Sequence, residues 1–240
     1  MKNRFKEYKY RISTDPEDLN AANGIPEELY RQMYDLHKRA LKGGKKNIEK
    51  LISYIRQYPG VPQLKNFLSV AWMKTGNIEK AREINRHIVQ EHPDYLFGRL
   101  NLAFEYYDKE QYEKIPEVVG EMMEIQELYP DRDCFHLSEV TGFYRLAIMY
   151  FCAIGNLEAA ESRYEILQEI APSHPDTEEV YPYIMKAYLK AGLKRMEDEN
   201  KTRISVKTVK HNKVIQRETK PDFINREIDW LYENGLRIEK

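Results

Sequence analysis

A six-residue pattern that occurs twice constrains the fold of this chain more than any other feature. Residues 76–81 read Gly-Asn-Ile-Glu-Lys-Ala, and residues 155–160 read Gly-Asn-Leu-Glu-Ala-Ala. In both copies a proline follows 17 residues after the glycine, at Pro93 and Pro172. Self-similarity of this kind is typical of repeat proteins, in which each unit must stack on its neighbours to bury its apolar face. The pattern therefore predicts a chain of stacked units.

Apolar residues recur at helical spacing on both sides of each copy, which predicts helix–turn–helix pairs. Four pairs are expected, over residues 27–60, 62–95, 96–130 and 141–174. A further helix follows over residues 177–191, with Gly192 as its cap. In the third pair we expect one second helix that carries apolar residues from Tyr112 to Ile125. Residues 130–140 form an insertion of about 11 residues relative to a period of 34.

The two ends of the chain lack this pattern. Residues 1–26 form a polar N-terminal arm, and the weak alternation from Lys6 to Ile12 fits a short strand or an extended segment. A C-terminal extension covers residues 193–240.

Within that extension we expect a short helix over residues 194–201. A β-hairpin over residues 203–219 is conceivable, because Ile, Val and Thr are frequent there. An amphipathic segment from Phe223 to Leu231 follows.

Residues 62–93 and 141–172 resemble tetratricopeptide (TPR) repeats, with 96–130 and about 28–60 as looser copies. The signature positions of the first copy are Leu68, Trp72, Gly76, Ala81 and Pro93. Those of the second are Tyr144, Ala147, Phe151, Gly155, Leu157, Ala160, Tyr164 and Pro172. The resemblance covers residues 27–192 and implies an all-α fold, a right-handed α-solenoid whose first helices line a concave surface.

Composition excludes several classes of function. Charged residues make up 32% of the chain but the formal net charge is −1, whereas a dedicated nucleic-acid binder carries a basic excess. The two cysteines, Cys134 and Cys152, lack metal-site or disulfide spacing, so we expect reduced thiols in the cytoplasm. The first residues form no signal peptide, and no long apolar run predicts a membrane span.

Catalytic motifs are missing from the sequence. It has no Walker-type loop and no Gly-x-Ser-x-Gly, and Gly43-Gly44-Lys45-Lys46 lacks the spacing of a phosphate loop. His87, Glu91 and His92 cluster, but a metal site would need another ligand, and a solvated helix end is the simpler interpretation. Cys134 and His136 lie in the insertion. A nucleophilic cysteine would need a lowered pKa and a partner, so an ordinary loop is the simpler interpretation there. We expect no enzyme, no cofactor and no metal.

The resemblance implies that binding residues lie on the concave face of the first helices. The candidates are Asn66, Val70, Met73, Asn101, Phe104, Tyr107, Arg145, Met149 and Lys186. TPR domains that clamp a terminal carboxylate use Lys, Asn and Arg on successive first helices, and here only Asn101 and Arg145 fit. An apolar–polar groove for a peptide or protein segment fits better. The expected function is a non-catalytic adaptor or scaffold.

Two alternatives remain open. The amphipathic segment from Phe223 to Leu231 would allow self-association, by capping or filling the groove of its own chain or of a second copy. The basic stretch over residues 201–220 would allow contact with nucleic acid. Its cations are Lys201, Arg203, Lys207, Lys210, Lys213, Arg217 and Lys220.

Overall fold

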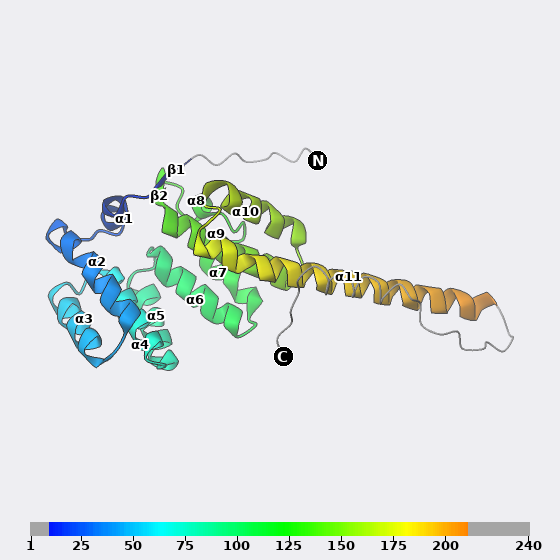
Figure 1. Cartoon of the computed structure of the whole chain (residues 1–240), viewed down its shortest axis with the longest axis horizontal. Helices are drawn as coiled ribbons and strands as arrows, with labels where there is room; N and C mark the ends of the chain where they lie inside the picture. The colour runs from blue at the N-terminus through cyan, green and yellow to red at the C-terminus, as the bar shows by residue number, and fades with distance from the viewer. Residues whose placement is uncertain (1–9, 211–240) are drawn as a thin grey trace. The chain divides into compact units, whose positions relative to one another are not determined.

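The structure, a computed structural model, describes residues 10–210 of the 240-residue chain. Within this range there are eleven α-helices, a 3-10 turn and two three-residue strands, which confirms the mostly helical class (Figure 1). The chain divides into two compact units, Met1–Leu193 and Lys194–Lys240. Of the second unit, the structure describes only the end of helix α11.

The first two predicted pairs are present with nearly the expected bounds. They are α2 (Glu27–Lys42) with α3 (Lys45–Gln57), and α4 (Pro62–Lys74) with α5 (Ile78–Glu91). Pro62 lies in the first turn of α4, where its missing N–H costs nothing. Gly43 and Gly44 separate α2 from α3 with φ angles of 62° and 86°, a region that glycine enters freely.

The repeated Gly-Asn pattern forms the same turn in both copies. Gly76 and Gly155 both have a φ of 80°. The asparagine that follows caps the next helix: Asn77 accepts a hydrogen bond from the backbone N–H of Lys80, and Asn156 accepts one from that of Ala159. In the second copy the turn joins α9 (Leu137–Ile154) to α10 (Leu157–Ile170). The pattern thus encodes the stop of one helix and the start of the next.

Small residues let the two helices of each pair approach closely. Ala81 is 1% exposed between α4 and α5, and Ala160 is fully buried between α9 and α10. The Ser69 hydroxyl on α4 donates to the Ala81 carbonyl at 3.1 Å, which is possible only at this short separation.

The third pair departs from the prediction. Its first helix, α6 (Leu96–Asp108), is as expected, but the single second helix through Ile125 is wrong. The chain instead forms a 3-10 turn (Tyr112–Lys114), α7 (Ile115–Val119) and α8 (Ile125–Leu128). Gly120 and Met123 break the helix, because their φ angles of 87° and 48° lie in the left-handed region.

The insertion is ordered by the N-terminal arm. Strand β1 (Arg11–Ser13) pairs in parallel with β2 (Cys134–His136), and Ile12 lies opposite Phe135 (Figure 1). The arm also contains α1 (Pro16–Ala22), which the sequence analysis did not predict. The Asp15 side chain accepts from the backbone N–H of Glu17 and caps this helix.

Helix α9 begins at Leu137, earlier than the predicted residue 141, because a capping box fixes its start. The His136 ring accepts from the Ser138 N–H, and the Glu139 carboxylate accepts from the His136 N–H at 2.9 Å. Glu139 is fully buried and receives two hydrogen bonds from Arg132, at 3.1 and 2.8 Å. The insertion is therefore fastened to the helix that follows it.

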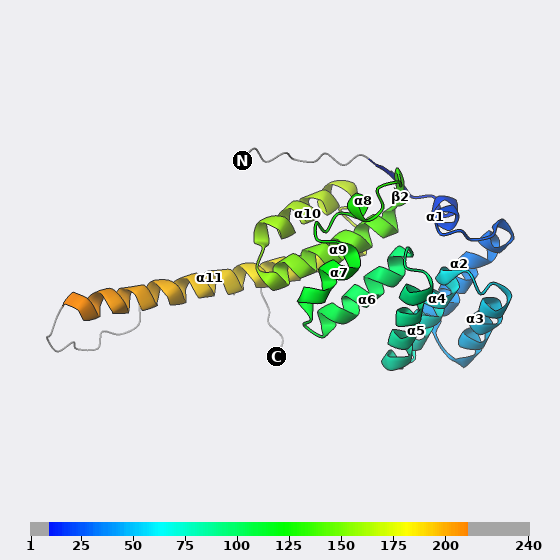
Figure 2. The ribbon, with the colours of Figure 1, turned by 180° about the vertical axis from the view of Figure 1, so that it is seen from behind.

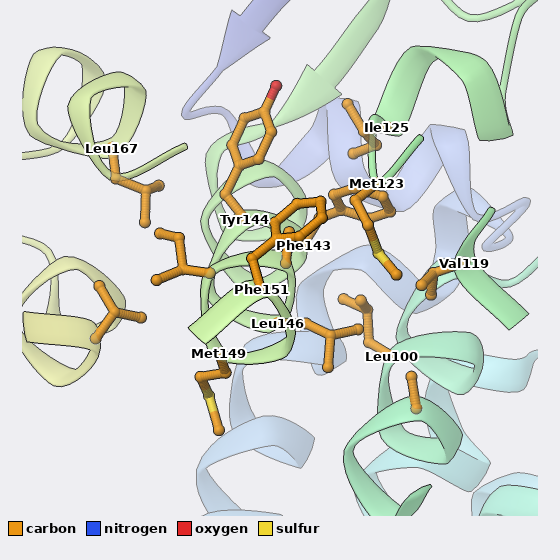
Figure 3. Packing of buried hydrophobic residues seen from close by; sticks show 14 of the residues in the cluster. Leu100, Val119, Met123, Ile125, Phe143, Tyr144, Leu146, Met149, Phe151 and Leu167 are labelled. Carbon is orange, nitrogen blue, oxygen red and sulfur yellow. The ribbon is translucent and has the colours of Figure 1, made fainter. Parts of the chain in front are cut away.

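The largest cluster of buried residues surrounds α9. Side chains from α6, α7, α8 and α10 meet there, including Leu100, Val119, Ile125 and Leu167 (Figure 3). Among the described residues, α9 is the one helix whose length and apolar composition suffice to span a membrane. More than half of α9 is buried against neighbouring helices. The core helix of a folded domain has the same apolar composition.

The final helix is longer than predicted. We expected Gly192 to end it and a separate short helix to follow over residues 194–201, with a hairpin over residues 203–219 as a conceivable continuation, but α11 runs from Pro175 to Lys210. The backbone of Gly192 is not in the left-handed region, so the glycine does not act as a cap. The hairpin is wrong for residues 203–210. Its remainder and the segment from Phe223 to Leu231 lie outside the described residues.

Candidate functional site

Helices α2, α4, α6 and α9 contact one another in succession, and α11 contacts α9 through a hydrogen bond from Thr141 to Asp176. We call these five helices the first-helix row (Figure 2). Rings of His37 and Phe67 stack at 5.2 Å between α2 and α4. The Arg145 guanidinium lies 5.1 Å from the centre of the Phe104 ring, between α9 and α6. The nine predicted binding residues all lie on helices of this row.

Two of the predicted residues bind each other. The Asn101 Nδ2 donates to the Asn66 Oδ1 at 2.8 Å and lies 3.5 Å from the Asn85 Oδ1. Asn85, on α5, is 6% exposed. These amides satisfy one another, so they link α4, α5 and α6.

Arg145 is also engaged within the chain. Its Nη1 lies 3.3 Å from the Asp176 Oδ1, and its Nη2 lies 3.0 Å from the Glu179 Oε2. Thr141 donates to the second oxygen of Asp176 at 2.8 Å. Two carboxylates from α11 therefore compensate this cation. Arg145 positions α11 on α9, and a ligand carboxylate would have to displace those partners.

Tyr107 belongs to an aromatic group at the ends of α6 and α11. Its ring lies 5.4 Å from that of Tyr112 and 6.3 Å from that of Tyr183. Burial raises the pKa of Tyr107 far above its ordinary value, so the phenol stays neutral. Burial also raises the pKa of nearby Cys152 to about 11, which leaves a protonated thiol that is a poor nucleophile at neutral pH.

The remaining predicted residues differ in exposure. Met73 is 50% exposed and Lys186 is exposed, whereas Val70 is half-buried. Met149 is 4% exposed and belongs to the core cluster (Figure 3), so it does not reach the surface. Of the nine predicted residues, therefore, Met73 and Lys186 alone have exposed side chains.

The structure adds three open side chains that the prediction missed. Tyr34 and Leu41 on α2 are 68% and 49% exposed, and Tyr183 on α11 is 36% exposed. Tyr34 and Leu41 are seven residues apart, so they share one face of α2. That spacing was visible in the sequence. The prediction missed them because the first pair is a loose copy of the repeat.

The other candidate clusters have structural roles. Lys65 forms an ion pair with Glu91 and its Nζ lies 3.4 Å from the His92 Nε2, so a cation occupies that helix end. The His136 ring caps α9, and its Nδ1 lies 2.8 Å from the Ser138 hydroxyl. Between residues 10 and 210 no group of three or more His, Cys, Asp and Glu side chains could hold a metal ion.

The sequence did not predict a buried series of hydrogen-bonded side chains formed by Tyr10, Tyr144 and Glu124. The Tyr144 hydroxyl donates to the Glu124 Oε1 at 2.8 Å and lies 3.1 Å from the Tyr10 hydroxyl. Burial raises the pKa of Glu124, although its hydrogen bond from Tyr144 lowers it in part. These hydrogen bonds connect the N-terminal arm and the start of α8 to α9. No periodicity in the sequence marks them.

Comparison of the chain with protein-family models, with curated proteins and with solved structures finds no match.

Proposed function

We propose that the protein is a non-catalytic adaptor of the TPR type, which binds a peptide or protein segment along its first-helix row. The observation that carries the proposal is the series of open apolar side chains on that row: Tyr34, Leu41, Met73 and Tyr183. Exposed apolar side chains on successive helices of one row offer separate contacts to an extended or helical segment. The identical Gly-Asn turns and the contacts between successive first helices support a stacked, solenoid arrangement.

Each part of the row has a definite role in this proposal. Met73 and Lys186 contact the ligand directly. The Asn66–Asn101 pair and the Phe104–Arg145–Asp176 group hold neighbouring helices at fixed separations, so the surface is preformed. A preformed surface loses little conformational entropy on binding. An extended or helical segment would lay its apolar side chains on this surface.

The test is a selection of random peptides displayed on phage against the full chain. Peptides that bind the wild type should bind Met73→Ser and Lys186→Glu variants at least tenfold more weakly, since each variant removes an open contact. Met122→Ser is the matched control, because Met122 is 60% exposed in the loop after α7 and lies outside the row. If no peptide is enriched, or if the control weakens binding equally, the proposal is wrong.

A second candidate function, self-association, is favoured by the exposed apolar stripe of α11. Tyr181, Tyr188, Leu189 and Leu193 are between 40% and 63% exposed. Light scattering over a range of concentrations tests this function. A monomeric mass throughout would eliminate it, and a dimer that Leu193→Lys dissociates would support it.

A further inference from the structure

The exposed face of α2 combines apolar and basic side chains. Tyr34, Lys38, Leu41 and Lys42 recur at helical spacing, opposite the buried side chains of the same helix. The Lys38 Nζ lies 4.2 Å from the centre of the Tyr34 ring, so the cation already sits beside the apolar surface. Helix α4 ends with the same combination, Met73 followed by Lys74.

The ends of α2 and α4 are in direct contact. A Cβ atom added to Gly43 would lie 2.9 Å from the Lys74 Cβ and 3.2 Å from the Ala71 carbonyl oxygen. Only glycine fits such an approach, and Gly43 also has a φ of 62°. The contact sets Gly43, which follows Leu41 and Lys42 in the chain, against Lys74, which follows Met73. We call the six residues Tyr34, Lys38, Leu41, Lys42, Met73 and Lys74 the basic–apolar patch.

The charge of this region is not balanced. Residues 38–50 contain one acid, Glu49, and six cations: Lys38, Arg39, Lys42, Lys45, Lys46 and Lys50. Arg39 pairs with Asp35, and Lys45 lies 4.0 Å from Glu49. In the part of the chain that the structure describes, no ion pair involves Lys38, Lys42 or Lys74. Because the whole chain has a net charge of −1, this excess is local.

We infer that the basic–apolar patch binds an acidic amphipathic protein segment, in which carboxylates alternate with large apolar side chains. The inference rests on the proposed function and specifies the chemistry of its ligand. The three lysines attract the carboxylates, while Leu41 and Met73, which are about half exposed, receive the apolar side chains. Single-stranded nucleic acid fits less well, because it needs stacking platforms and the patch offers only the Tyr34 ring, beside Lys38.

The lysines are spread over two helices, so they match carboxylates along a segment and not a single chain end. A peptide whose C-terminus is amidated should therefore bind as well as one with a free carboxylate. The affinity should fall by about fivefold or more as the ionic strength is raised to its physiological value, since salt screens exposed charges.

The experiment measures fluorescence anisotropy of labelled probes with the full chain. The main probe is a synthetic amidated peptide of Glu, Asp, Leu and Phe. Its controls are the same peptide with Gln and Asn at the acidic positions, the same peptide with Ser at the apolar positions, and single-stranded RNA. We expect the main peptide to bind at least tenfold more tightly than any control.

Two sets of variants then locate the site. Lys42→Glu combined with Lys74→Glu, and separately Met73→Ser, should weaken binding roughly tenfold or more. Lys190→Glu on α11, which also reverses an exposed lysine, should have little effect. Circular dichroism of each variant establishes that it is folded.

The outcomes separate this inference from the proposed function. Peptides enriched by phage display that lack acidic residues would uphold the adaptor and overturn the acidic ligand. Tighter binding of the RNA than of the acidic peptide would also overturn it. If display enriches no peptide at all, the adaptor proposal itself fails.

Discussion

Glu110 occupies a turn position that glycine occupies elsewhere in the chain. Its φ is 56°, whereas Gly76 and Gly155 have a φ of 80° at the equivalent ends of α4 and α9. The hydrogen bonds are also equivalent: the Gln111 N–H donates to the Tyr106 carbonyl at 2.9 Å, as the Asn77 N–H does to that of Trp72 at 3.0 Å. A side chain at this position is strained.

Replacing Glu110 by glycine should therefore stabilise the protein. Relief of the left-handed conformation gains about 1–2 kcal/mol, and the greater freedom of glycine in the unfolded chain costs about 0.4–1 kcal/mol. We expect the free energy of unfolding in urea to rise by about 0.5–1 kcal/mol. Gly155→Ala is the converse control and should lower it. A loss of stability in Glu110→Gly would show that the side chain has a stabilising role.

The buried carboxyl of Glu124 predicts a dependence on pH. Desolvation by burial raises its pKa in the folded chain above the value in the unfolded chain. Between these two values the folded state binds more protons, so its contribution to stability is present at low pH and is lost as the pH rises. Glu124→Gln cannot titrate but retains an amide oxygen for the Tyr144 hydroxyl.

The measurement compares urea unfolding of Glu124→Gln and wild type between pH 7 and pH 4.5. The wild type should gain stability relative to the variant as the pH falls, by about 1.4 kcal/mol for each unit that separates the two pKa values. A constant difference would mean that burial of Glu124 leaves no net shift. A change of the opposite sign would mean that its hydrogen bonds outweigh burial.

Among the elements, α11 differs most from its prediction. Gly192 lies inside the helix, away from the left-handed region, and an added Cβ would meet no atom within 4 Å. Glycine inside a helix is less favourable than alanine by about 1 kcal/mol. Gly192→Ala should therefore stabilise α11 and slow hydrogen exchange in the turns on either side. If Gly192 instead capped the helix, the same change would destabilise it.

The accuracy of the sequence analysis followed the strength of local signals. The pairs α2–α3, α4–α5 and α9–α10 could be predicted, because glycine, a capping asparagine and helical periodicity mark their ends. Helix α7 stops at Gly120 although the helical spacing of apolar residues continues beyond it. Periodicity alone therefore predicted a single helix where the structure has two. Pairing of β1 with β2 joins residues more than 100 positions apart, and no local pattern reports such a contact.

The candidate site was predictable only in part, for the same reason. Helical periodicity placed Met73 and Lys186 on first helices, and both are exposed. It could not show that Asn66 would bind Asn101, or that two carboxylates of α11 would surround Arg145. Those contacts depend on how neighbouring helices pack, which a single sequence does not specify.

The first unit as a whole contains two separate clusters of buried residues. One runs from Ile25 to Ala71 and includes Leu51, and the other runs from Leu96 to Ile184 and includes Leu146. Figure 1 shows the helices that supply them, α2–α4 for the first cluster and α6–α10 with the start of α11 for the second. Because the two clusters are separate, local stability can differ between the helices that surround each of them.

This arrangement predicts that a cavity made in one cluster destabilises the helices around that cluster more than those around the other. Leu51 is fully buried and Leu146 is 1% exposed, so replacing either by alanine should cost about 2–5 kcal/mol locally. In native-state hydrogen exchange, Leu51→Ala should reduce protection in α3 and α4 while α9 and α10 stay close to wild type, and Leu146→Ala should do the reverse. Each variant thus serves as the control for the other. Uniform loss of protection in both would mean that the two clusters unfold as one cooperative body, because a strong interface between them would then couple their stabilities.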